Sequence, residues 1–147
     1  MEKLSVIAHP VKGIRFSPYS FVDISNDIVI TANPLVDIFD DEKKYLWGAY
    51  DGSGEPIELT FNEYFTQFIY DKDFANAKMV SYNASIVKGN RKNNIHEVYP
   101  NSTFVEYHFP GYDPKYEGMD WKSLRLVFEE KDNVWYLIAI VHDQWTI

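Results

Sequence analysis

The strongest constraint in the sequence is a pair of strand-forming segments near its end. Residues 124–129 and 134–142 are rich in branched and aromatic side chains, and the polar residues 130–133 separate them. Such side chains favour extended strands, and a short polar segment between two strands favours a turn. The sequence therefore predicts a long antiparallel hairpin, which the rest of the chain must cover.

The clearest signal outside this hairpin is a capped amphipathic helix. Thr60 and Glu63 have the spacing of a capping box, in which each side chain accepts a hydrogen bond from the backbone N–H of the other residue. The apolar residues of this segment recur with the period of a helix, and they are Phe61, Tyr64, Phe65, Phe68 and Ile69. We therefore predict a helix with an aromatic face buried in the core.

The first third of the chain carries weaker signals. Residues 13–22 mix turn formers with aromatic residues and predict an irregular or extended segment. Residues 27–30 predict a short strand, and Asn33 and Pro34 predict the cap and first position of a short helix. Residues 45–59 predict a hairpin with a glycine-rich turn.

Length, composition and charge limit the class of protein. A chain of 147 residues without a glycine-rich or proline-rich linker fits one domain, and the absence of cysteine excludes disulfides and zinc–thiolate sites. Because 22 acidic residues outnumber 14 basic ones, the net charge is −8, which disfavours nucleic acids and anionic membranes as partners. No apolar run is long enough to span a bilayer. We expect a cytoplasmic protein; the alternative is an exported protein whose leader is absent from this sequence.

The best candidates for chemistry lie on the predicted strands. Alternation along residues 104–109 places Glu106 and His108 on one face, and His142 is followed directly by Asp143. If the strands are neighbours, the four side chains converge. A neutral imidazole beside a carboxylate suits general acid–base catalysis, and two histidines with an acid suit a divalent metal. The alternative is that these residues face solvent or bond only to the backbone.

Two tyrosines are candidate polar donors for such a site. Alternation along the last strand predicts that Tyr136, Ile138, Ile140 and His142 share one face. Tyr107 lies on the face opposite to that of Glu106 and His108 by the same rule. The two tyrosines therefore cannot both face the candidate histidines.

A long aromatic connection precedes the final hairpin. Residues 110–121 include Tyr112, Tyr116 and Trp121, and long connections in compact domains are often binding loops. With Tyr136 and Trp145, these side chains are the candidate ligand-binding residues. The alternative is that they pack back on the sheet and only fix the loop.

Residues 124–145 resemble the closing hairpin of the NTF2-like superfamily. There, a strand leads through a charged turn into a strand that begins with tryptophan, as at Trp135, and ends near histidine or tryptophan. The chain also resembles an uncharacterised bacterial family, through residues 13–19, 47–57 and 142–145, whose members are stand-alone or C-terminal modules and often exported. The superfamily resemblance implies an α+β cone, in which helices cover the concave face of a curved mixed sheet, with a pocket and frequent dimerisation through the sheet. The first half lacks the long N-terminal amphipathic helix of such cones.

The resemblance leaves the function open, because NTF2-like cones include isomerases, dehydratases and hydrolases as well as transport factors and binding modules. Nucleotide-binding, nucleophile-elbow and zinc-protease motifs are all missing from the sequence. Our first hypothesis is a non-catalytic module that binds a small molecule, a peptide or a cell-envelope component, with no cofactor. The alternative is a small acid–base enzyme that uses a histidine and a carboxylate in the cone pocket. A weaker third hypothesis is a metal site formed by both histidines and a carboxylate.

Overall fold

A computed structural model describes residues 2–86, 93–111, 114–117 and 120–144 of the chain. The strands are β1 (Ile14–Ser17), β2 (Ile28–Ile30), β3 (Tyr45–Ala49), β4 (Pro56–Leu59), β5 (Met79–Tyr82), β6 (Ser102–Phe109), β7 (Lys122–Lys131) and β8 (Val134–Gln144). The α-helices are α1 (Glu2–Ile7), α2 (Ala32–Leu35), α3 (Phe61–Tyr64) and α4 (Ile95–Val98). The 3-10 helices are η1 (Ile38–Asp40), η3 (Phe74–Asn76) and η4 (Pro114–Tyr116), and η2 (Phe65–Ile69) is a π-helix.

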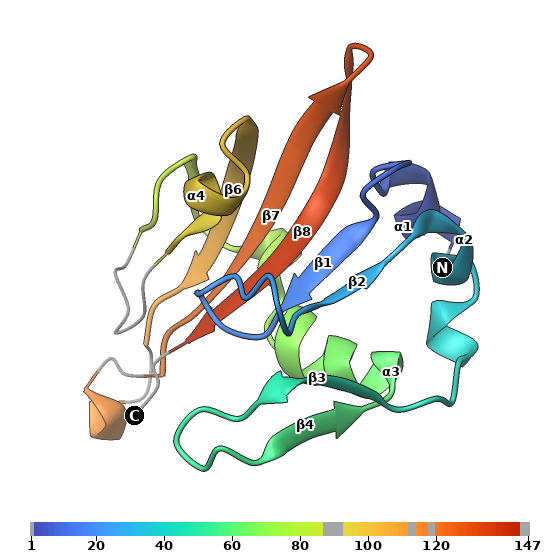
Figure 1. Ribbon diagram of the computed structural model, residues 1–147. Helices are drawn as coiled ribbons and strands as arrows, with labels where there is room; N and C mark the ends of the chain where they lie inside the picture. Colours follow the sequence, from blue (N-terminus) through green and yellow to red (C-terminus); the bar gives the residue numbers. More distant parts are fainter. Residues whose placement is uncertain (1, 87–92, 112–113, 118–119, 145–147) are drawn as a thin grey trace.

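The fold is α+β and is built on one curved sheet, as predicted (Figure 1). The strand order is β2-β1-β8-β7-β6-β5, and every pair is antiparallel except β1 with β8. The hairpin of β3 and β4 forms a separate two-stranded sheet. The predicted terminal hairpin is confirmed, and its turn is tighter than expected. It contains only Asp132 and Asn133, at φ 53° and 64°, a left-handed conformation that Asp and Asn tolerate.

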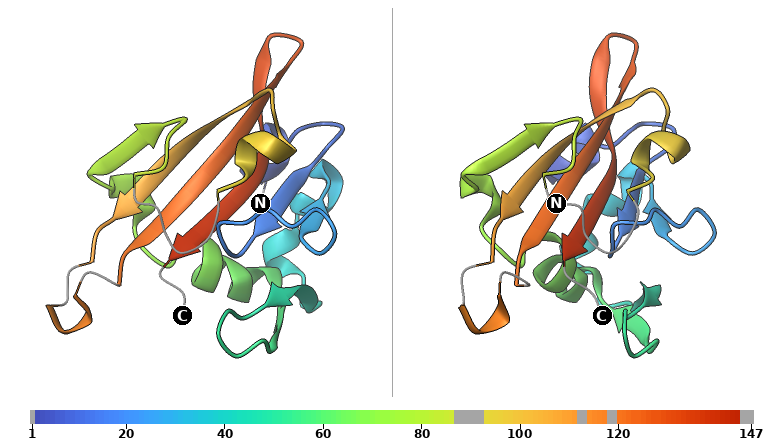
Figure 2. Two further views of the ribbon diagram at one scale, coloured as in Figure 1. Left: turned by 60° about the vertical axis from the view of Figure 1, so that its left-hand side comes forward. Right: turned by 90° about the vertical axis from the view of Figure 1, so that its left-hand side faces the viewer.

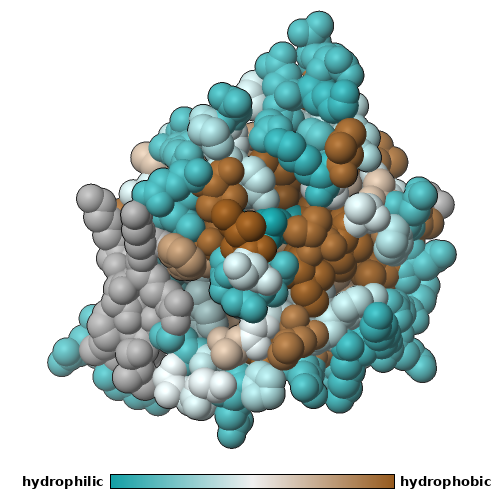
Figure 3. Space-filling model, viewed as in Figure 1, coloured by the Kyte–Doolittle hydropathy of each residue, from teal (hydrophilic) through white to brown (hydrophobic). Residues whose placement is uncertain are grey.

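Alternation along β6, β7 and β8 divides their side chains between two faces. We call one the α3 face, which carries Leu124 and Ile140 and packs against α3 and η2. The other is the α4 face, which carries Phe104, Arg125 and Val141 and packs in part against α4. Figure 2 shows the helices arranged around the sheet in this way. Figure 3 shows the α4 side, where apolar residues gather at the centre of a largely hydrophilic surface.

An aromatic core joins the separate hairpin to the main sheet through α3. Trp47 of β3 stacks on Tyr64, with ring centroids 4.0 Å apart, and Phe16 of β1 contacts both rings edge to face. The predicted capping box is confirmed: Glu63 N–H donates to Thr60 Oγ1 at 3.2 Å and Thr60 N–H donates to Glu63 Oε1 at 2.9 Å. The predicted helix is also present, although its second half is π-helical, which the apolar period does not reveal.

Two local predictions are corrected by the structure. The short helix α2 begins at Ala32, directly after Thr31. Thr31 therefore occupies the N-cap position, and Asn33 lies inside the helix. On β8, Ala139 and Leu137 pair with consecutive residues of β7, which makes Ile138 an extra residue, a β-bulge. Tyr136 therefore lies on the face opposite to that of His142, and the prediction that they share a face is wrong. None of the described helices has both the length and the apolar character needed to cross a membrane.

Replacing Thr60 with alanine should lower the free energy of unfolding by about 1 kcal/mol, because the first turn of α3 loses its side-chain cap. Urea unfolding of the full chain measures this change. Thr66→Ala is the matched control, since Thr66 is exposed on the same helical segment and its hydroxyl only donates back to the Asn62 carbonyl. Equal losses in the two variants would contradict a stabilising capping box.

Candidate functional site

A buried ionic network occupies the α4 face at the centre of the sheet. Arg125, Glu106 and Asp143 are 1%, 0% and 2% exposed. Arg125 Nε donates to Glu106 Oε1, its Nη2 donates to Asp143 Oδ2 at 2.9 Å, and its Nη1 donates to Ser20 Oγ at 2.9 Å. The second oxygen of Glu106 accepts from the Ile86 N–H at 2.7 Å. The guanidinium thus satisfies two carboxylates that water does not reach.

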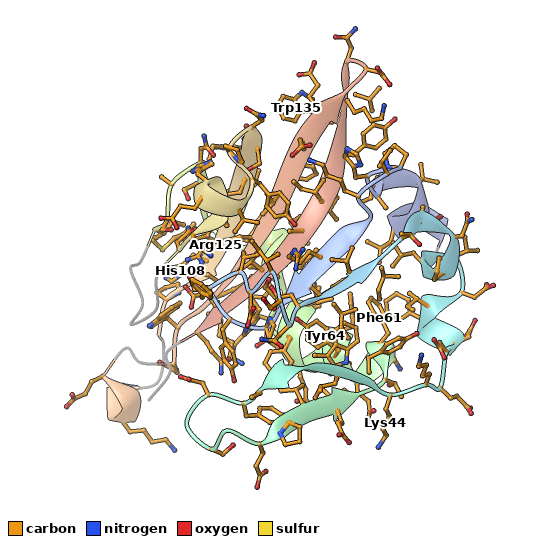
Figure 4. The ribbon with its side chains drawn as sticks, in the orientation of Figure 1. Lys44, Phe61, Tyr64, His108, Arg125 and Trp135 are labelled. Atoms are coloured by element: carbon orange, nitrogen blue, oxygen red, sulfur yellow. The ribbon has the colours of Figure 1, made fainter. Side chains whose placement is uncertain are left out.

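His108 lies beside this network and is also buried. Its Nδ1 is 2.6 Å from Ser123 Oγ, and its ring centroid is 5.9 Å from that of Trp121. Burial lowers the pKa of His108 below its ordinary value, while Glu106 raises it and Arg125 lowers it. The imidazole is therefore neutral at neutral pH. Figure 4 shows His108 and Arg125 close together on β6 and β7.

His142 lies on the α3 face, with an acceptor at each ring nitrogen. Nε2 is 2.9 Å from Asp71 Oδ2, and Nδ1 is 3.2 Å from the Pro18 carbonyl oxygen. Lys122 Nζ donates to the same Asp71 oxygen at 2.6 Å. Burial would raise the pKa of Asp71, but its hydrogen bonds and the charges of His142 and Lys122 outweigh burial and lower it. An ionised carboxylate and a carbonyl oxygen are both hydrogen-bond acceptors, so each ring nitrogen of His142 faces an acceptor.

The predicted convergence of the four site residues is wrong. In the register of the sheet, His108 is opposite Ser123 and Ser123 is opposite Asp143, so His108 and Asp143 share the α4 face with Glu106. His142 is opposite Leu124 on the other face. The strand β7 separates the two histidine-bearing strands, which excludes a metal site that uses both histidines. Within the described ranges, no three histidine or acidic residues cluster closely enough to hold a metal.

The predicted ligand-binding residues are dispersed. Trp121 is buried against His108. For Trp121 the structure therefore agrees with the alternative interpretation, in which the aromatic residues of the loop pack back on the sheet. Tyr136 is half-buried and its ring lies 5.9 Å from that of His9. Tyr112, Trp145 and the side chain of Tyr116 lie outside the part of the chain that the structure describes.

A pocket of about 430 Å³ opens on the α3 face, and the sequence did not reveal it. Its floor is formed by five residues of β6, β7 and β8, which are Tyr107, Leu124, Leu126, Leu137 and Ile140. Leu4 and Ile7 of α1 form one wall. The opposite wall comes from the end of η2 and from η3, with Ile69, Tyr70, Phe74 and Ala75. The pocket forms because these short helices leave part of the apolar sheet face uncovered between them.

Besides the pocket, the local sequence patterns missed two charged residues, Arg125 and Asp71. Arg125 is the one charged residue within residues 124–128 of β7, which are otherwise apolar, and this charge was an available signal. Asp71 follows the helix in a polar stretch that resembles an ordinary solvent-exposed loop. No matching family model, curated protein or solved structure was found when the chain was compared with each of these groups.

Arg125→Met should lower the free energy of unfolding by about 3–5 kcal/mol, because Glu106 and Asp143 would remain buried without a countercharge. The triple variant Glu106→Gln, Arg125→Met, Asp143→Asn should recover most of that loss. Urea unfolding is the measurement, and Lys131→Met, which breaks an exposed pair with Asp132, should change stability little. A cost of Arg125→Met no larger than that of Lys131→Met would refute the network.

The Asp71 carboxylate should make stability depend on pH in the acidic range. Its pKa is lower in the folded chain than the ordinary value of 3.8, so the ionised group stabilises the fold above that pH, and the contribution is lost as the pH falls through the folded pKa. The stability difference between the wild type and Asp71→Asn should therefore be larger at pH 5 than at pH 3. Thermal unfolding across this range measures it, with the exposed Asp37→Asn as control. A difference that does not vary with pH would contradict the ion pair.

Proposed function

We propose that this chain is a non-catalytic, NTF2-like binding module and that its ligand is a small apolar molecule held in the α3-face pocket. The observation that carries the proposal is the lining, since every residue that the structure places around the pocket is apolar or aromatic. Its volume of about 430 Å³ lies within the range of small-molecule sites, roughly 300–1,000 Å³. A ring system or a short acyl chain would release water from this lining on binding.

The arrangement of layers supports the NTF2-like part of the proposal. A long terminal hairpin lies at the centre of a mixed sheet, helices pack on one face, and a pocket lies between the helices and that face. The departure is at the start of the chain, where α1 has six residues in place of a long amphipathic helix.

Two tyrosines line the pocket, and the hydroxyl of one of them is available to a ligand. The Tyr70 hydroxyl donates to Asp73 and accepts from the Ala75 N–H at 3.1 Å. The hydroxyl of Tyr107, on the floor, has no hydrogen-bond partner among the described residues. A ligand with one oxygen or nitrogen at this position would gain a hydrogen bond, which would fix its orientation in an otherwise non-directional site.

The acid–base enzyme is the less well supported function. Such an enzyme needs a base that reaches a bound substrate, and the candidate histidines are buried against protein partners. Neither histidine lies among the residues that line the pocket. The same buried contacts explain why these polar residues occur in the strands without assigning them to catalysis.

A substitution that fills the pocket should abolish binding of a neutral fluorescent probe, N-phenyl-1-naphthylamine. Ala75 is exposed at the rim, so Ala75→Trp adds an indole to the pocket without disturbing the core. We expect the wild type to bind the probe with enhanced fluorescence and Ala75→Trp to bind at least tenfold more weakly.

The matched control is Ala84→Trp, which places the same side chain at an exposed alanine that is not part of the pocket lining. This variant should bind the probe as the wild type does. The proposal fails if the wild type does not bind the probe, or if the two tryptophan variants bind it equally well.

A further inference from the structure

A second hollow, separate from the α3-face pocket, lies between β3 and the loop of residues 18–27. It has a volume of about 220 Å³. Its walls carry three aromatic residues, Tyr19, Phe21 and Trp47, and three polar ones, Asp23, Asn26 and Asp27. A neighbouring hollow of about 340 Å³ shares Asp23 and Asn26 and continues along β3, which pairs with no described strand except β4. We call the first hollow the Asp27 cleft.

The carboxylate of Asp27 has hydrogen bonds on one oxygen only. Oδ2 accepts from the Ser17 hydroxyl and from the Asp23 N–H, the latter at 2.9 Å. Oδ1 has no partner among the described residues and is not a buried atom, so it is open to the cleft that the residue lines. One face of a partly buried carboxylate is therefore available to a ligand.

No cationic side chain in the described segments forms an ion pair with Asp27. Arg15 lies near enough to act on its charge, but its guanidinium donates to the Tyr99 hydroxyl at 2.8 Å and to the Asp23 carbonyl at 3.4 Å. Burial consequently raises the pKa of Asp27 to about 6, although the Ser17 hydrogen bond and Arg15 lower it. The cleft thus contains a carboxylate that has no direct ion-pair partner among the described residues.

A buried hydroxyl without a partner lies under the same region. Tyr64 is fully buried, its hydroxyl makes no hydrogen bond among the described residues, and its ring stacks on the Trp47 ring that forms part of the cleft wall. Its hydroxyl is within electrostatic range of both Asp27 and Tyr19. An unsatisfied polar group at this depth is costly and requires an explanation, and this one lies directly behind the Trp47 ring of the cleft wall.

We propose that the Asp27 cleft binds a small organic cation, a guanidinium or primary ammonium group, which pairs with Asp27 and packs against the aromatic walls. Aromatic faces attract such cations, and their alkyl parts gain apolar contact. The net charge of −8 raises the concentration of cations near the protein. A bare divalent metal fits less well, because it requires several oxygen ligands where this cleft offers aromatic walls and one open carboxylate oxygen.

The test compares two ligands of the same shape, n-butylguanidinium, which is charged, and n-butylurea, which is neutral. Titration calorimetry on the full chain should give a dissociation constant at least tenfold lower for the guanidinium. Asp27→Asn should raise that constant at least tenfold, because the amide keeps the shape and removes the charge. Equal binding of the two ligands, no binding, or unchanged binding in Asp27→Asn would overturn the proposal.

Two more variants keep the test independent of folding and of net charge. Asp132→Asn, in the exposed β7–β8 turn, makes the same change in net charge and should leave the dissociation constant within twofold of the wild-type value. Phe21 is 47% exposed, so Phe21→Ala spares the core and should weaken binding at least threefold. No loss in Phe21→Ala would show that the cation binds elsewhere.

The source of the cation is resolved by a second ligand, an N-acetylated and C-amidated Ala-Arg-Ala peptide. Binding of the peptide more tightly than butylguanidinium, with the same loss in Asp27→Asn, would assign the cation to an arginine of a protein partner extended along β3. Tighter binding of butylguanidinium would assign it to a free small molecule. Both results require Asp27, and the failure of both ligands would contradict the site while leaving the α3-face pocket untested by this experiment.

Discussion

Burial of β8 on both of its faces is the constraint on which the rest of the structure depends. The strand pairs with β7 on one side and β1 on the other, and its residues from Leu137 to Asp143 are buried. Consecutive side chains point to opposite faces, so the two polar residues His142 and Asp143 require partners in different layers. Arg125 supplies the partner on the α4 face and Asp71 supplies it on the α3 face.

This division explains how the polar residues of the sheet are accommodated in its two layers. On the α4 face Arg125 forms ion pairs with both Glu106 and Asp143, and on the α3 face Asp71 forms an ion pair with Lys122 and a hydrogen bond with His142. The remaining floor of the α3 face is apolar, and the short helices leave it accessible as a pocket. The apolar character of this accessible surface, and not the identity of the polar residues, is therefore the basis of the proposed binding of an apolar molecule.

The sequence predicted the features that depend on local physical chemistry. The capping box of Thr60 and Glu63, the terminal hairpin and the face shared by Glu106 and His108 all follow from spacing and alternation. It did not predict the features that depend on strand order. Because β7 lies between β6 and β8, and β1 joins β8 in parallel, the convergence of His108 with His142 could not be judged from the strands alone.

The pocket on the α3 face could be predicted from the sequence even less than the strand order. The pocket depends on where α1 and η3 stop over the sheet, and no residue pattern specifies the space between two short helices. The bulge at Ile138 changed the face of Tyr136, since one extra residue reverses the alternation for the rest of a strand. Arg125 was the exception, because a charge within the apolar run of residues 124–128 does signal a buried partner.

The most direct test of the account is to locate a bound apolar molecule in solution. Intermolecular nuclear Overhauser effects would be measured between N-phenyl-1-naphthylamine and the methyl groups of the full chain, labelled at leucine and isoleucine. The account predicts contacts from the probe to Leu126, Leu137 and Ile140 on the pocket floor. Contacts confined to methyl groups outside the pocket, such as that of Ile95 on the α4 side, would contradict it.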